Sequence, residues 1–211
     1  MEGVFMKKFV CAIVSLLCIA AWANEENGDI QLPQPNLKGN VSLKSAFKER
    51  RTSRTFSRKD LSALDISNLL WAANGVNRDN GKLTIPAARG IYTIELYVAL
   101  SDGVYKHNRE TNVLQKVVSK DLRSASDSRK MGAQAPVVVV MVADQSKFGE
   151  KGAHYVAMEA GAIMQNLYLY CAGYKLGTVV CGSFDKNVWA KELKLPADKY
   201  VILTQVVGCM R

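Results

Sequence analysis

The sequence feature that most constrains the fold is an aliphatic run at Pro136–Val142. It reads PVVVVMV and contains no polar residue. β-Branched side chains favour strands, and a strand without polar alternation is typical of one that is buried on both faces. The chain is therefore expected to build a sheet with this strand near its centre and a packed layer on each side.

Helical patterns supply candidates for those layers. The longest covers Gly152–Ala172, with small and apolar residues recurring along one face and glycines near its end. A second amphipathic pattern runs over Asp60–Ala73 and is closed by Asn74-Gly75, which is typical of a helix C-terminus. Ser42 is a suitable N-cap for a short helix that ends near Arg50. We expect the helix at 152–172 to be the core helix.

Further strands and helices fill the rest of the chain. Ile91–Leu100 has the composition of a strand and ends in a Ser-Asp-Gly turn, so with 104–106 and 113–118 it predicts a three-stranded meander. Other elements are expected as strands at 178–181 and 200–207, and as helices at 121–131 and 187–193. Because strands and helices mix without a regular β-α-β repeat, the predicted class is α+β.

Residues 1–23 are typical of a secretory signal peptide. Two lysines, Lys7 and Lys8, precede the apolar run Phe9–Ile19, and Ala21-Trp22-Ala23 forms a small-x-small cleavage site. Cleavage would leave Asn24 as the first mature residue. The mature protein is therefore expected to be exported, to the periplasm, and to have no stable membrane insertion.

Two alternatives to cleavage fit the N-terminus less well. A membrane anchor would need about 20 consecutive apolar residues, which is more than this segment provides. A lipoprotein processed at Cys18 would place the bulky Leu17 where a small residue is required. Beyond the signal peptide we expect an extended, proline-containing arm at 24–40 and a single domain at 41–211.

Charge and cysteine content narrow the classes of partner. Removing residues 1–23 takes away two lysines and one glutamate, so the net charge falls from +9 to +8. No basic stripe interleaved with aromatic residues is present, so nucleic acid is not expected as a partner, whereas a phosphorylated small molecule is compatible with the charge. The mature cysteines, Cys171, Cys181 and Cys209, lie in helical or strand patterns and are expected to be buried free thiols. With two histidines and no Cys-x-x-Cys, no zinc site is expected.

The string Arg50–Phe56, RRTSRTF, is the most notable polar cluster. Three guanidinium groups and three hydroxyls in one loop offer the charge-assisted, fork-shaped donors that a phosphate dianion requires. Such a loop is also compatible with a merely solvated surface. Neither a Gly-x-Gly-x-x-Gly nor a Walker-type phosphate loop is present, so any phosphate site must be of another kind.

Three further strings could contribute to a site. Pro86–Gly90, PAARG, contains small residues that allow a backbone to approach a flat ring closely. Glu159-Ala160-Gly161 lies within the predicted core helix, where small residues more often indicate tight packing. In Gly177–Asp185, the residues Gly182 and Ser183 could direct backbone N–H groups at an acceptor.

Taken in order, these four strings resemble the FMN-dependent nitroreductase family over about residues 41–210. Arg50–Phe56 is similar to the Arg-Arg-Ser-x-Arg-x-Phe motif of that family, with Thr52 in place of serine. The resemblance implies a nitroreductase-like fold, with a mainly antiparallel central sheet flanked by helices and the long core helix at a homodimer interface. It also implies FMN as the cofactor, bound in a site built from both subunits.

The resemblance assigns roles residue by residue. Arg50, Arg51 and Thr52 would contact the phosphate and ribityl end of FMN, and Arg54 would stabilise the negative charge of reduced flavin near N1. Gly182 and Ser183 would face N5, and Arg211 is the candidate for the basic residues that follow the last strand in relatives. The isoalloxazine would lie against the backbone of Pro86–Gly90, where relatives carry serine. The remaining candidates for cofactor binding are therefore Pro86, Ala87, Ala88 and Arg89.

The resemblance also implies the reaction and its alternatives. A hydride donor, NADH or NADPH, and a small acceptor such as a nitroaromatic or quinone would use one pocket in turn, with hydride passing through flavin N5. An exported flavin-binding protein without turnover is one alternative, because NAD(P)H is scarce outside the cytoplasm. An azoline-oxidising or dehalogenating flavoenzyme is another. Azoline oxidation is disfavoured, because Lys147-Phe148 stands where that branch carries a Lys-Tyr pair.

Overall fold

The structure is a computed structural model that describes residues 23–24, 28–149 and 152–211. The predicted signal peptide, apart from Ala23, lies outside these residues. The helices are α2 (Leu43–Glu49), α3 (Ala63–Asn74), α4 (Ala153–Gly173) and α5 (Lys186–Glu192). The strands are β1 (Ala23–Asn24), β2 (Asp29–Gln31), β3 (Ile94–Leu100), β4 (Gly103–Asn108), β5 (Val113–Val118), β6 (Val137–Asp144), β7 (Leu176–Cys181) and β8 (Lys199–Cys209).

One sheet contains all of these strands. Their order is β1-β2-β5-β4-β3-β6-β8-β7, and every neighbouring pair is antiparallel. The α+β class and the meander of β3, β4 and β5 are therefore confirmed. Strand β6, which contains the aliphatic run, lies between β3 and β8, and all eight of its residues are buried. The prediction of a central strand covered on both faces is confirmed.

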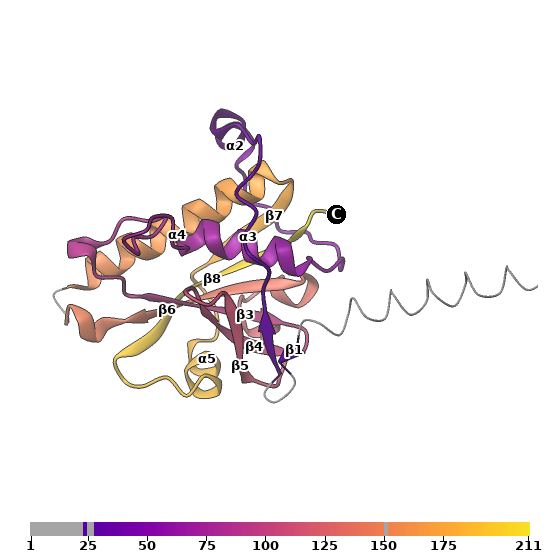
Figure 1. Cartoon of the computed structure of the whole chain (residues 1–211). Helices are drawn as coiled ribbons and strands as arrows, with labels where there is room; N and C mark the ends of the chain where they lie inside the picture. Colours follow the sequence, from indigo (N-terminus) through magenta and orange to yellow (C-terminus); the bar gives the residue numbers. More distant parts are fainter. Residues whose placement is uncertain (1–22, 25–27, 150–151) are drawn as a thin grey trace, which may run out of the picture.

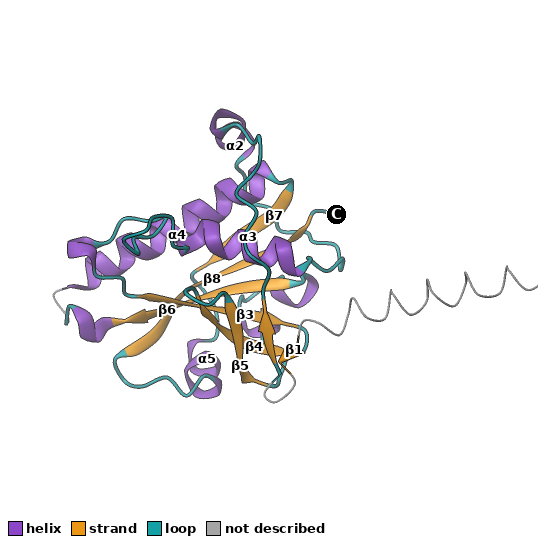
Figure 2. Cartoon of the chain, viewed as in Figure 1, coloured by secondary structure: helices purple, strands orange, loops and turns teal. Residues whose placement is uncertain are grey.

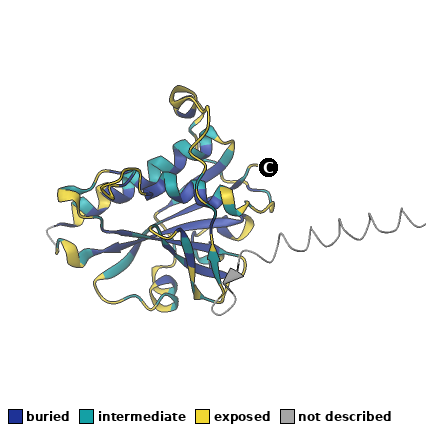
Figure 3. Ribbon diagram, viewed as in Figure 1, coloured by how far each residue is buried: buried dark blue, intermediate teal, exposed yellow. Residues whose placement is uncertain are grey.

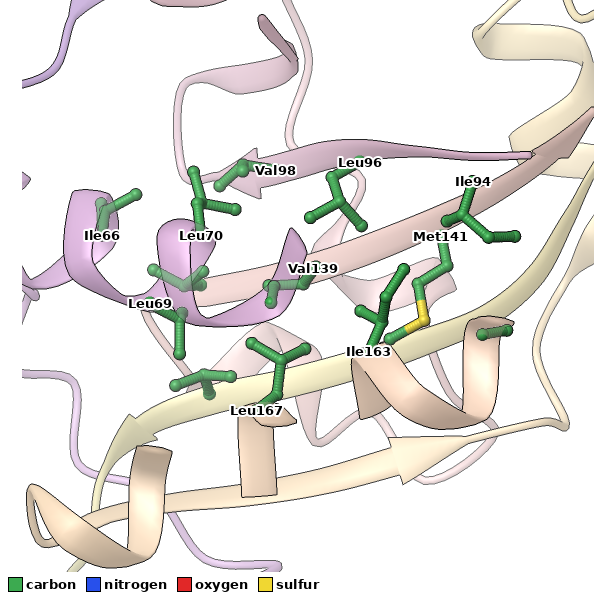
Figure 4. Close-up of a cluster of buried hydrophobic side chains, with 14 of the residues drawn as sticks. Ile66, Leu69, Leu70, Ile94, Leu96, Val98, Val139, Met141, Ile163 and Leu167 are labelled. Atoms are coloured by element: carbon green, nitrogen blue, oxygen red, sulfur yellow. The ribbon is translucent and has the colours of Figure 1, made fainter. Parts of the chain in front are cut away.

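Two layers cover the sheet. Helices α3 and α4 lie across one face and α5 lies against the other (Figures 1 and 2). On the first face, Leu69 and Leu70 of α3 and Ile163 and Leu167 of α4 pack against alternate residues of β3 and β6 (Figure 4). On the second face, Trp189 of α5 is fully buried in a separate cluster with the outward residues of β6. Burying a large aliphatic side chain stabilises the fold by about 2 kcal/mol, so these two clusters hold the layers together.

The predicted core helix is confirmed, and its neighbours begin later than expected. α3 starts at Ala63 rather than Asp60, because Ser62 and Asp65 form a capping box that fixes the first turn. Strand β3 starts at Ile94 rather than Ile91, because the N–H groups of Thr93 and Ile94 donate to the Glu159 carboxylate. Polar side chains thus set both boundaries.

The helix predicted at Asp121–Met131 is wrong. The structure has only a short 3-10 turn at Arg123–Ala125, followed by irregular chain. The carboxylate of Asp127 accepts hydrogen bonds from the N–H groups of Arg129, Met131 and Gly132 at 2.8 to 2.9 Å. An aspartate that takes backbone donors in this way competes directly with the helical ladder.

The remaining segments lie at the periphery. The arm expected at 24–40 is tied to the sheet by β2, and is irregular from Leu32 to Ser42. Helix α2 stands away from the sheet and packs on α4 (Figure 1). Its Leu43 and Phe47 are 64% and 56% exposed, and this helix is mostly yellow in Figure 3. Among the described residues, no helix is both long and apolar enough to cross a membrane.

Candidate functional site

The residues 50–56, here called the arginine loop, run along the outer strand of the sheet. Ser53 N–H donates to the carbonyl of Thr178 in β7 at 2.9 Å, and Phe56 forms a bridge with Met210 after β8. Phe56 is buried, and its ring packs close to Gly177, where an added Cβ would lie 3.3 Å away. The buried phenylalanine therefore anchors a loop whose charged residues remain at the surface.

Tyr168 of α4 connects the arginine loop to β7. Its hydroxyl lies 3.1 Å from the Thr52 hydroxyl and accepts a hydrogen bond from Val180 N–H at 3.2 Å. The guanidinium carbon of Arg50 lies 5.2 Å from the centroid of the same ring, within the range of a cation–π contact. One buried tyrosine thus contacts both Arg50 and Thr52, and sequence analysis missed it because nothing in the helical pattern distinguishes it.

The guanidinium groups of the loop have no acidic partner among the described residues. Within the described residues, no salt bridge involves Arg50, Arg51 or Arg54, and the last two are exposed. Arg51 borders a cavity of about 300 Å³ that also touches Cys171 and Met210. Cations without carboxylate partners are available to an anionic ligand.

The far end of β7 presents backbone donors. Gly182 and Ser183 follow the last strand residue, Cys181, and are exposed. In the described part of the chain, neither of their N–H groups has a hydrogen-bond partner. Burial raises the pKa of the Cys181 thiol to about 11, while the positive charge of Arg54 acts to lower it. Arg54 therefore lies near the residues that the sequence assigned to the flavin ring.

The C-terminal candidate lies near the opposite end of β7, where Leu176 pairs with Cys209. Arg211 is exposed and directly follows Met210, whose sulfur accepts from the Ser53 hydroxyl at 3.6 Å. The candidates are therefore distributed along β7, with Arg211 near its first residues, the loop 50–54 beside its middle, and Gly182 and Ser183 after its last residue. We call this region the β7 site.

The residues Pro86–Gly90, here called the alanine loop, lie between α3 and β3. Ala88–Gly90 form a 3-10 turn in which Arg89 has φ 55° and Gly90 has φ 71°. A left-handed arginine is uncommon and costs of order 1 kcal/mol, so the surrounding chain must hold this turn. Pro86 and Arg89 are exposed, and Ala87 and Ala88 are half-buried. The loop therefore presents its backbone at the surface.

Glu159 of α4 holds the chain just after the alanine loop. Its buried carboxylate accepts from Thr93 N–H at 2.9 Å, from the Thr93 hydroxyl at 2.8 Å and from Ile94 N–H at 3.1 Å. Glu159 precedes Tyr168 by nine residues, which corresponds to about 14 Å along a helix axis. The two anchors therefore lie at different levels of α4, with Glu159 beside the chain that follows the alanine loop and Tyr168 beside the arginine loop.

No metal centre accompanies these loops. Among the described residues, no group of three or more His, Cys, Asp or Glu side chains could hold a metal ion. Within the described ranges, Cys171 in α4 and Cys181 in β7 are buried free thiols, as predicted, whereas the free thiol Cys209 in β8 is only half-buried. The chemical resources of the site are therefore cations, hydroxyls and backbone N–H groups, which suit an organic anion.

Comparison with known proteins agrees with this geometry. The nitroreductase family profile matches residues 47–209. A protein of Methanocaldococcus jannaschii described as a nitroreductase is 32% identical over 194 residues, which cover 85% of this chain and 96% of that protein. A crystal structure from Ralstonia eutropha JMP134, also described as a nitroreductase, has a TM-score of 0.82 and 33% identity, covering 90% of this chain and 93% of the other.

A more distant structure shares the fold. An FMN-dependent nitroreductase from Clostridium difficile R20291 has a TM-score of 0.56 at 17% identity, covering 79% of this chain and 86% of that protein. The resemblance drawn from the four sequence strings, and the nitroreductase-like fold that it implied, are therefore confirmed. The chain belongs to the nitroreductase family of oxidoreductases.

Proposed function

We propose that this protein is an FMN-dependent oxidoreductase that takes hydride from NADH or NADPH and passes it to a nitroaromatic, a quinone or a similar small acceptor. The observation that supports it best is the arginine loop beside β7: within the described residues its guanidinium groups form no salt bridge, and the strand leads to Gly182 and Ser183, whose N–H groups have no partner there. The fold shared with an enzyme described as FMN-dependent supports FMN as the cofactor. When bound, FMN supplies hydride acceptance and donation at its N5 atom.

The residues of the β7 site fit such a cofactor. Arg50, Arg51 and Thr52 would hold the phosphate and ribityl chain, because fork-shaped cations and a hydroxyl match phosphate oxygens. Arg54 would stabilise negative charge on the ring edge, and Arg211 would add a further cation. The hydroxyl of Tyr168, 3.1 Å from the Thr52 hydroxyl, keeps Thr52 in place. These roles require no side-chain acid or base at the reacting atom.

We further propose that the site is completed by a second copy of the chain. Glu159 and Tyr168, which hold the chain after the alanine loop and the arginine loop, lie about 14 Å apart along α4, and we infer that the alanine loop, with Ala87 and Ala88 at its centre, meets the arginine loop of the second copy. Two large apolar side chains one turn apart on α2, Leu43 and Phe47, are exposed and support a homodimer. Large apolar side chains gathered on a surface are typical of a subunit interface.

Export to the periplasm is also proposed, on the sequence of residues 1–23 alone. It predicts a mature N-terminus at Asn24, which N-terminal sequencing of the protein from a periplasmic extract would test. An uncleaved N-terminus would contradict it.

The cofactor and the reaction are tested together by absorbance spectroscopy. The purified protein should be yellow, and NADH or NADPH should bleach it until a nitroaromatic or quinone restores the colour. The double variant R51Q/R54Q should bind FMN at least tenfold more weakly, because it loses two phosphate- or ring-facing cations. Arg58→Gln is the matched control, because Arg58 is exposed just beyond the loop. FMN binding that no donor can reduce would favour a binding protein without turnover.

The dimer is tested by sedimentation. The variant L43D/F47D should dissociate and lose FMN, whereas V117D should do neither, because Val117 is similarly exposed on β5 at the other side of the sheet. A wild-type monomer that retains FMN would overturn the shared site.

A further inference from the structure

A cleft of about 960 Å³ lies on the alanine-loop side of the molecule. Five segments form its walls: the N-terminal arm at Gln34 and Pro35, the end of α3 at Trp71, the loop at Gly81 and Leu83, the residues after the alanine loop at Tyr92, and the β4–β5 turn at His107 to Asn112. Lys147, which follows β6, closes one side. This volume lies within the range of small-molecule sites, at about 300–1,000 Å³.

Two cationic side chains, Lys147 and Arg109, contact Tyr92. Lys147 Nζ donates to the Tyr92 carbonyl at 2.7 Å, and the guanidinium carbon of Arg109 lies 6.0 Å from the Tyr92 ring centroid. In the described part of the chain, neither cation forms a salt bridge. Both side chains are therefore available to an anionic group bound in the cleft beside Tyr92. The exposed Glu110 is the one acidic side chain among the lining residues.

Aromatic rings in fixed positions line the same cleft. The indole N–H of Trp71 donates to the Val76 carbonyl at 2.9 Å, and the Tyr92 hydroxyl accepts from Leu83 N–H at 3.0 Å. Both rings are half-buried and lose little freedom when a ligand binds. Rings held in this way offer flat apolar surface beside the two cations.

The β4–β5 turn adds a neutral polar group to the cleft. The Asn112 amide nitrogen donates to the Pro33 carbonyl and the Ser67 hydroxyl, so its oxygen must accept from His107 Nε2. Burial, with a further contribution from Arg109, lowers the pKa of His107 to about 4. The imidazole is therefore neutral at pH 7, and the positive charge of the cleft comes from Arg109 and Lys147.

We propose that this cleft binds a small aromatic carboxylate, with its carboxylate between Arg109 and Lys147 and its ring against Trp71 and Tyr92. None of the residues assigned to FMN lines the cleft. The proposal therefore stands apart from the proposed flavin chemistry, and holds whether or not the protein carries FMN.

Benzoate and its neutral analogue benzamide are the probes. Each is titrated into the purified mature protein by isothermal titration calorimetry. Benzoate should bind at least tenfold more tightly than benzamide. Each of R109Q and K147Q should weaken benzoate severalfold, and the double variant at least tenfold. Lys191→Gln is the matched control, because Lys191 is exposed on α5 on the opposite face of the sheet. Lys147 is exposed, so K147Q tests the cleft without disturbing the core.

Three results would overturn the proposal: no benzoate binding, equal affinity for benzoate and benzamide, or unchanged benzoate affinity in R109Q/K147Q. The variant R51Q separates the two regions, because it should leave benzoate binding intact. Loss of benzoate binding in R51Q alone would move the ligand to the β7 site and sink the proposal. Flavin absorbance of the same preparations reports independently on the proposed enzyme function.

Discussion

The two ends of α4 hold two loops in opposite ways. Near its C-terminal end, Tyr168 holds the arginine loop by one hydroxyl contact and the face of its ring. Near its N-terminal end, Glu159 holds the start of β3 by a buried carboxylate with three donors. The first anchor is neutral and leaves the cations of the loop unpaired. In the second anchor, all of these hydrogen bonds are accepted by the Glu159 carboxylate, which is buried and has no role at the surface.

This difference separates ligand binding from structural support. Hydrogen bonds to a buried charge are individually stronger than neutral ones, and removing the charge leaves its donors unsatisfied. The chain after the alanine loop should therefore be rigid and costly to alter. The arginine loop should tolerate change with a small loss of stability but a larger loss of ligand affinity.

The largest effect is expected for Glu159→Ala. The substitution leaves Thr93 N–H, the Thr93 hydroxyl and Ile94 N–H buried without an acceptor, so unfolding free energy should fall by about 3 kcal/mol. Urea denaturation of the variant measures this loss. Glu159→Gln is the matched control and should lose less, because its amide keeps one acceptor oxygen. An E159A protein as stable as wild type would show that this anchor carries no energetic weight.

The next effect is the pH dependence of stability that arises from His107. The folded-state pKa of His107 is lowered from 6.5 to about 4, so between these values the unfolded chain takes up a proton that the native state does not. The contribution of His107 to the free energy of unfolding is therefore present above pH 6.5 and is lost as the pH falls toward 4. The His107 contribution to this loss between pH 7 and pH 5 should be about 2 kcal/mol.

Denaturation of wild type and His107→Gln at pH 7 and pH 5 tests this expectation. The glutamine amide can still donate toward Asn112 but does not titrate, so H107Q should lose less stability than wild type on acidification. Equal losses in the two proteins would place the acid sensitivity elsewhere. The result sharpens the contrast between the loops, because His107 lines the cleft on the alanine-loop side.

Much of the fold could be predicted from local patterns. The aliphatic run of β6 and the long α4 pattern define the centre of the sheet and its main covering layer, and both lie where sequence analysis placed them. The errors arose where a polar side chain overrides the pattern. Asp127 takes the donors of a predicted helix, and Ser62 with Asp65 resets the start of α3.

The candidate site was predictable to a similar degree. The arginine loop is contiguous in sequence, so its composition alone identified it. Tyr168 and Glu159 act across 116 and 66 residues, respectively, and their contacts arise only when α4 packs on the sheet. No pattern within one segment encodes such pairs.

The smallest effect on stability is expected for Tyr168→Phe, which is the most direct test of the contrast. The change keeps the ring beneath Arg50 but removes the hydroxyl that accepts from Val180 N–H and contacts Thr52, so unfolding free energy should fall by about 1 kcal/mol. FMN affinity, measured by flavin fluorescence, should fall severalfold, because Thr52 loses its support. Tyr170→Phe is the control. Tyr170 lies two residues after Tyr168 on the same helix, and its ring stacks on Tyr174 rather than on the arginine loop, so this variant should retain FMN affinity. If Y168F instead lost as much stability as E159A, the two ends of α4 would be equivalent anchors. The division between a rigid loop and a ligand-facing loop would then fail.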